Sequence, residues 1–265
     1  SNHSNWVSAY NYLSDFANGT LQFKNLNVPL LDEFKEHLLK AKSKRSSKTT
    51  LAQNSAVSYF NKVKAALKQA YKDGIIQEDL NAKVQPITAE ETRKEFLTIE
   101  ELNSLVKTPC NNLILKCAAL FSALTGLRFS DIQKMTWGMV ELVNGEGYFL
   151  NFKQKKTKGI EVYPISEQAY NLTEGMKNPK GMPQEKNVFE GLKYSAYHNK
   201  HLYQWIGAAG ITKDITFHCF RHTFATLQLF NGTDIYTVSK MLGHKDLKST
   251  QVYAKIVDKA KRTAA

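Results

Sequence analysis

Residues 215–254 read ITFHCFRHTFATLQLFNGTDIYTVSKMLGHKDLKSTQVYA, and this stretch decides the fold of the C-terminal part of the chain. Apolar residues recur at the spacing of one helix face from Phe217 to Leu227. Gly232 and Gly243 interrupt the pattern, because glycine marks turns and helix ends. We therefore expect three consecutive helices in this stretch.

Four polar residues stand isolated in that apolar sequence: His218, Arg221, His244 and Tyr253. His218 and Arg221 are three residues apart, so they share a helix face near its start. A cation there opposes the positive end of the helix dipole, which anions stabilise. Because this placement destabilises the helix, it indicates a functional role, and it predicts an anionic ligand such as a phosphate.

Composition limits the class of protein. The 265 residues are 42% hydrophobic, which is enough for a core and suits two modest domains. Lys and Arg total 36 against 24 Asp and Glu, and the net charge of +12 favours a polyanion such as nucleic acid or an acidic membrane surface. The sequence has no apolar run of about 18 residues and no signal-peptide pattern, so we expect a soluble intracellular protein without a membrane partner. The three cysteines lack CxxC spacing, which argues against a disulfide framework and a zinc cluster.

The pattern divides the chain into a helical domain at 1–85, a linker at 86–95 and a second domain at 96–265. A polar loop, AKSKRSSKTT at 41–50, lies between two helical runs of the first domain. This loop has enough positive charge to contact phosphates, although a solvated loop explains it equally well. Its candidate DNA-binding residues are Lys42, Lys44, Arg45 and Lys48.

The second domain is expected to be mainly α with a small antiparallel β-sheet. Thr98 and Glu101 have the spacing of a capping box, which marks a helix start. A longer apolar helix is expected from Asn111 to Thr125, with its end at Gly126. Residues 147–165 place aromatic and β-branched residues on both sides of a Lys-rich centre, which predicts a β-hairpin.

The isolated polar residues suit phosphoryl transfer. Arg128, at a turn into a short helix, and Arg221 can each offer paired N–H donors to phosphate oxygens and stabilise the charge of a pentacoordinate transition state. Histidines can donate hydrogen bonds or exchange a proton. A tyrosine hydroxyl has a pKa of about 10, so Tyr253 needs such a cationic site or a base to attack phosphorus.

Each of these residues, taken alone, has a structural explanation. Tyr253 suits a core aromatic position, and Arg128 suits an ion pair with Asp131. His218 and His222 are four residues apart, as in some metal sites, but no third ligand or general base is evident. We therefore expect no metal and no cofactor, and we interpret His222 as a packed or supporting histidine.

Three segments resemble the signature boxes of the tyrosine recombinases, the phage-integrase family, in order, context and spacing: TGLRFSDI, HCFRHTFAT and MLGHKDLKSTQVYAK. The resemblance covers the whole second domain. Residues 1–85 resemble, less specifically, the helical core-binding (SAM-like) domain of this family, in the style of integrases of conjugative and mobilisable transposons. The resemblance thus implies a helical DNA-binding domain followed by an α+β catalytic domain.

The resemblance also implies a role for each matching residue. Arg128 and Arg221 would bind the scissile phosphate, His218 and His244 would assist, and Tyr253 would be the nucleophile. The family's hairpin lysine, which protonates the leaving 5′ oxygen, matches Lys156, eight residues before Pro164. Neighbouring lysines leave this register open. Asp131 matches the acidic position that orients the first arginine.

The implied reaction is a transesterification through a 3′-phosphotyrosine bond that releases a 5′ hydroxyl, without ATP or metal. It implies double-stranded DNA attachment sites, a homo-tetramer on two duplexes, directionality or host accessory factors, and a place in the bacterial cytoplasm. One alternative is a DNA-binding protein that has this fold but does not cut. Another is a type IB topoisomerase. The intact Tyr253 and both arginines favour the enzyme, and the character of the first domain argues against the topoisomerase.

Overall fold

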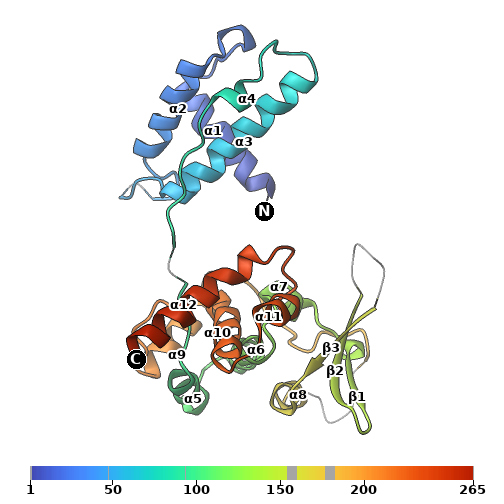
Figure 1. The fold of residues 1–265 in the computed structure, drawn as a ribbon. Helices are drawn as coiled ribbons and strands as arrows, with labels where there is room; N and C mark the ends of the chain where they lie inside the picture. Colours follow the sequence, from blue (N-terminus) through green and yellow to red (C-terminus); the bar gives the residue numbers. More distant parts are fainter. Residues whose placement is uncertain (1, 47, 93, 154–159, 177–182, 265) are drawn as a thin grey trace. The chain divides into compact units, whose positions relative to one another are not determined.

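The computed structural model describes residues 2–46, 48–92, 94–153, 160–176 and 183–264 (Figure 1). The chain divides into two compact units, Ser1–Thr92 and Arg93–Ala265. The division falls within the residues expected to form the linker. No helix in the described part of the chain has the length and apolar character needed to cross a membrane.

The N-terminal unit is helical, as its sequence periodicity predicts. Its elements are α1 (Asn2–Phe16), a 3-10 turn (Phe23–Asn25), α2 (Val28–Lys40), α3 (Gln53–Lys72) and α4 (Leu80–Lys83). Phe34 of α2 and Phe60 of α3 are fully buried, with ring centroids 6.3 Å apart, and they lie in the core that these helices share.

The C-terminal unit is built around α6 and α10, which pack against each other (Figure 1). Its helices are α5 (Ile99–Lys107), α6 (Leu113–Thr125), α7 (Phe129–Lys134), α8 (Glu167–Glu174), α9 (Ala196–Ala208), α10 (Phe217–Phe230), α11 (Ile235–Met241) and α12 (Lys248–Ala264). The three helices predicted for the C-terminal stretch are thus confirmed as α10, α11 and α12. Phe217, Phe220 and Phe224 are buried, as the apolar stripe of α10 requires.

Two helix starts illustrate how local sequence sets this fold. The capping box is confirmed, because the Glu101 amide donates to Thr98 Oγ1 (3.2 Å) and the Thr98 amide donates to Glu101 Oε2 (2.8 Å). Helix α6 begins at Leu113 rather than Asn111, because the Asn112 side chain caps it by accepting the Leu115 amide.

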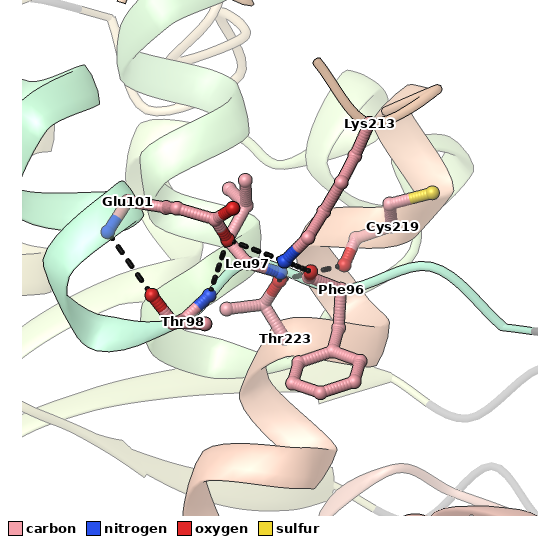
Figure 2. A network of polar contacts seen from close by, with 7 residues as sticks. All are labelled: Phe96, Leu97, Thr98, Glu101, Lys213, Cys219 and Thr223. Carbon is pink, nitrogen blue, oxygen red and sulfur yellow. Dashed lines mark hydrogen bonds and ion pairs between the residues drawn. The ribbon is translucent and has the colours of Figure 1, made fainter. Parts of the chain in front are cut away.

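The first residues of the C-terminal unit are fixed to α10 by a polar network (Figure 2). The Leu97 amide donates to Thr223 Oγ1 (2.9 Å) on α10, and this hydrogen bond is buried. Lys213 Nζ donates to the Phe96 carbonyl (3.1 Å) and to Glu101 Oε2 (2.6 Å). The segment just before α5 is therefore held against the helix that carries His218 and Arg221.

The predicted hairpin is confirmed as β2 (Gly147–Lys153) paired antiparallel with β3 (Ile160–Ile165). Within the described residues a third strand, β1 (Val140–Val143), pairs with β2, which gives the order β1-β2-β3. Strand β1 was not predicted, because it has four residues, two of them exposed and two half-buried, which are too few for a period of two to stand out. Leu150 of β2 is fully buried and attaches the sheet to the core of the unit.

Candidate active site

Helix α10 places three polar residues within two turns. His218 is exposed in the first turn, whereas Arg221 and His222 are buried, with 3% and 7% of their surface exposed. The rings of His218 and His222 meet edge to face, with centroids 4.6 Å apart, because residues four apart on a helix are neighbours. The helix thus brings an arginine and two imidazoles to one place.

Arg221 ties three helices together. Its Nη1 donates to the Gly126 carbonyl (2.5 Å) at the end of α6, and its Nη2 donates to the Leu242 carbonyl at the end of α11. Burial, and then the charge of Arg128, lower the pKa of Arg221 to about 10, so the group is still a cation at pH 7. The fold therefore keeps a buried positive charge whose hydrogen bonds go to backbone carbonyls.

Arg128 lies at the N-cap position of α7, immediately after the turn that Gly126 makes. Oδ2 of Asp131 lies 4.0 Å from Nη1 of Arg128, and both side chains are more than 40% exposed. Such an exposed pair is weak, so Asp131 leaves Arg128 available to a ligand. The charge of Arg128 lowers the pKa values of His218, Arg221, His244 and Tyr253.

Tyr253, on α12, is buried, with 5% of its surface exposed. Its hydroxyl lies 2.6 Å from Nδ1 of His222, and the two ring centroids are 5.4 Å apart. Burial raises the pKa of the Tyr253 hydroxyl, while the charges of Arg221 and Arg128 act against that rise. The same two arginines would stabilise a tyrosinate or an adjacent phosphate.

The histidines of the site are neutral at pH 7. Burial lowers the pKa of His222 to about 3 and that of His244 to about 4. Partial desolvation of the ring also lowers the pKa of His218, with Arg221, Arg128 and Lys94 acting in the same direction. Of the pair that opposes the dipole of α10, Arg221 therefore carries the charge, and His218 is a neutral donor or acceptor.

His244 is oriented by α12. Its Nδ1 lies 2.8 Å from the hydroxyl of Thr250, a residue with no exposed surface. This contact leaves Nε2 to face a ligand, because the second nitrogen of an imidazole is oriented by the bond that the first one makes.

The structure thus brings together five of the six residues expected to be catalytic: Arg128, His218, Arg221, His244 and Tyr253. The sixth, Lys156, lies outside the described residues. No group of three or more His, Cys, Asp or Glu side chains in the described ranges is arranged to hold a metal ion.

The loop expected to contact DNA belongs to the N-terminal unit. Tyr12 fixes it, since its hydroxyl donates to the Lys42 carbonyl (3.0 Å) and accepts the Lys44 amide (3.1 Å). Lys44 Nζ lies 2.5 Å from Asp15 Oδ2, so part of its charge is offset, whereas Arg45 and Lys48 are exposed.

Two further residues contact this site: His222, which the sequence analysis interprets as a packed or supporting histidine, and Thr250, which did not stand out in the sequence. His222 touches the Tyr253 hydroxyl, and Thr250 orients His244. Helical spacing contains a signal for each: His222 follows His218 by four residues, and Thr250 precedes Tyr253 by three. A position on the shared face of a helix therefore marks a candidate even for a residue whose type suggests packing.

The two arginines and three histidines around the buried Tyr253 hydroxyl can bind a phosphate, and the hydroxyl can attack it. On a mainly helical fold with a small sheet, this arrangement defines an enzyme class that transfers phosphoryl groups through tyrosine.

Comparison with known proteins agrees with this class. Residues 95–260 match the model of the phage integrase family, and residues 1–84 match that of the phage integrase SAM-like domain. The tyrosine recombinase XerD of Lacticaseibacillus casei is 30% identical over 208 residues, which are 71% of this chain and 69% of the relative. The chain belongs to the phage integrase family, whose activity is site-specific DNA recombination through a tyrosine.

Solved structures share the fold. A lambda integrase tetramer bound to a Holliday junction has a TM-score of 0.62 and 16% sequence identity. The alignment covers 93% of this chain and 70% of the lambda integrase chain. The Tn1549 transposon integrase in complex with a circular intermediate DNA has a TM-score of 0.65 and 17% sequence identity. The alignment covers 95% of this chain and 89% of the Tn1549 integrase chain. The expected fold class, mainly α with a small antiparallel sheet, is confirmed.

Proposed function

We propose that Tyr253 is the nucleophile of this recombinase and that the chain integrates or excises a mobile element. One observation carries the assignment of the nucleophile: the Tyr253 hydroxyl lies in the electrostatic field of both Arg128 and Arg221, each of which lowers its pKa. A tyrosine that served only to pack in the core would not require two guanidinium groups close to its hydroxyl.

In this proposal Arg128 and Arg221 hold the scissile phosphate, and His218 and His244 donate hydrogen bonds to it or move protons. Tyr253 Oη attacks phosphorus, a 3′-phosphotyrosine bond forms, and the 5′ oxygen leaves with a proton, for which Lys156 is the proposed donor. A 5′ hydroxyl from another strand reverses the step. One phosphoester replaces another, so the reaction needs no ATP, and the cationic side chains supply the charge stabilisation that a metal supplies elsewhere.

The assembly is proposed from chemistry and from relatives. Two rounds of strand exchange between two duplexes need four nucleophiles, and the lambda integrase that shares this fold is a tetramer on a Holliday junction. The likeness to a transposon integrase supports the role in a mobile element. Residues 1–85 would form the core-binding domain on double-stranded attachment sites in a bacterial cytoplasm, with accessory factors setting the direction.

The decisive experiment uses a nicked half-site from the element's own attachment sequence, obtained by sequencing the junctions of the element that encodes this chain. The nick lets the cleaved end diffuse away, so the covalent intermediate accumulates. We expect a denaturation-resistant protein–DNA adduct with the wild type and none with Tyr253→Phe. If the two proteins behave alike, the enzymatic proposal is lost and a DNA-binding role without cleavage replaces it.

The basic loop is tested separately, through binding. Arg45→Ala with Lys48→Ala should weaken DNA binding several-fold and reduce the slope of log K against log salt by about 2, because each phosphate contact adds about one unit of slope. A double variant of equal charge change on α3, Lys68→Ala with Lys72→Ala, is the matched control. Equal losses in both variants would assign the effect to overall charge instead of to the loop.

A further inference from the structure

Attack by Tyr253 requires a destination for the hydroxyl proton. His222 Nδ1 lies 2.6 Å from the Tyr253 oxygen and is the only imidazole nitrogen within hydrogen-bond distance of it in the described residues. We propose that His222 is the general base of the cleavage step and takes this proton as the tyrosine oxygen attacks phosphorus. The inference rests on the proposed function of Tyr253 as nucleophile.

The Oη–P bond forms while the Oη–H bond breaks, and the proton moves along the existing hydrogen bond to His222 Nδ1. The P–O5′ bond breaks, its electron pair goes to the 5′ oxygen, and that oxygen is protonated by the general acid on the leaving-group side. In rejoining, His222 returns the proton to the departing tyrosine oxygen.

Among the described contacts, no other polar group of the site is hydrogen-bonded to the Tyr253 hydroxyl. Nδ1 of His244 is engaged with Thr250, and Arg221 has no lone pair to accept a proton and directs its donors to two carbonyls. The ring of His218 lies edge to face against His222, and no hydrogen bond joins it to Tyr253 among the described contacts.

The surroundings of His222 link this base to substrate binding. The groups that act on it are His218 and Arg221 from α10, His244 from the turn before α12, Lys94 from the segment before α5, and the Tyr253 hydroxyl itself. Burial and these basic neighbours hold its pKa near 3, so in the absence of DNA the proton stays on Tyr253. A bound phosphate offsets the positive field and raises the proton affinity of His222, so the nucleophile is activated only when its target is in place.

The first test measures the single-turnover rate of adduct formation between pH 5.5 and 8.5. Asparagine keeps a hydrogen-bond acceptor at the position of Nδ1 but cannot take the proton. We expect His222→Asn to slow the adduct about 100-fold, since general base catalysis contributes about 10²–10⁴-fold, and we expect the control His198→Asn to leave the rate unchanged. A His222→Asn rate within threefold of the wild type would overturn the proposal.

A second substrate separates the two ends of the reaction. A half-site with sulfur in place of the bridging 5′ oxygen has a leaving group that needs no proton. His222→Asn should remain slow on this substrate, whereas a variant that lacks the general acid should recover. Recovery of His222→Asn would place His222 on the leaving-group side and refute the assignment.

A third measurement needs no variant. Nitrogen NMR of the wild-type chain with isotope-labelled histidines should show that His222 is protonated on Nε2 and unprotonated on Nδ1. A proton on Nδ1 would make His222 the donor in the contact and would overturn the proposal even if His222→Asn failed to fold. A wild type that forms no adduct would instead refute the proposed function, so the two failures are distinguishable.

Discussion

Acidification from pH 7.5 to 5.0 should destabilise the C-terminal unit, because its buried histidines resist protonation. His222 has a pKa of about 3 in the folded chain against a reference value of 6.5. Between those values the unfolded chain binds the proton and the folded chain does not. The stability is therefore fully present above pH 6.5 and is lost as the pH falls from there toward 3.

The size of the effect follows from the distance below the unfolded pKa. At pH 5.0 this distance is about 1.5 units, and at about 1.4 kcal/mol per unit His222 accounts for a loss of about 2 kcal/mol. His244, with a folded pKa of about 4, acts in the same direction, but solvent screening at its more exposed position reduces its share to about 1 kcal/mol. We expect these two histidines together to lower the unfolding free energy by about 3 kcal/mol. The carboxylates with lowered pKa, such as Asp234, add their losses at lower pH.

Urea unfolding followed by tryptophan fluorescence measures this loss. Trp137 and Trp205 are buried in the C-terminal unit, at 6% and 2% exposure, and Trp6 is the third of the three tryptophans. The substitution Trp6→Phe therefore leaves a signal from the C-terminal unit alone. In this background His222→Asn should reduce the pH-dependent loss by about 2 kcal/mol, which is the share of His222.

Two results would refute this reasoning. The first is a wild-type stability that is equal at the two pH values within about 0.5 kcal/mol, which is smaller than the share of a single buried histidine. The second is an equal loss in the wild type and in His222→Asn, which would place the titrating group elsewhere.

Three further substitutions test the framework of the site. Gly126→Ala should cost more than about 3 kcal/mol, because a Cβ at φ +71° would meet an aromatic ring atom of α10 at 2.5 Å, whereas Gly210→Ala at φ +75° has open space and should cost about 1 kcal/mol; equal costs in urea unfolding would contradict the clash. Thr250→Val should slow adduct formation about 10-fold by releasing His244, and Thr250→Ser should restore it; a normal rate in the valine variant removes the orienting role. Arg221→Ala should abolish the adduct and lose about 2 kcal/mol of stability by orphaning two buried carbonyls. DNA affinity should persist in Arg221→Ala, since phosphate contacts are spread over many cations, so a large loss of binding would argue against that division.

Features set by neighbours in the sequence were predictable here. The capping box of Thr98 and Glu101, the apolar stripe of α10 and the β2–β3 hairpin each follow from residues within one helical turn or one strand pair. The resemblance to the family then supplied the residues that surround the candidate phosphate position.

Contacts between distant residues were not predictable from spacing. Arg221 donates to the carbonyl of Gly126, 95 residues away, and His222 meets Tyr253 across 31 residues. Local periodicity places His222 on a helix but carries no information about which ring or hydroxyl lies opposite it. The pKa values of these histidines depend on burial, which only the packed unit defines.

The hydrogen bonds from Arg221 to two backbone carbonyls have a consequence for where the DNA is cut. A guanidinium carries five N–H groups, and at least two of those on Arg221 are spent on the carbonyls that end α6 and α11. The guanidinium cannot turn toward a misplaced ligand without breaking these hydrogen bonds. If Arg221 binds the scissile phosphate as proposed, its remaining donors are therefore held in a fixed position relative to the main chain. A DNA backbone shifted by a fraction of a nucleotide would meet these donors out of alignment, and the enzyme would thereby select which phosphodiester in its site is cut without reading the base beside it.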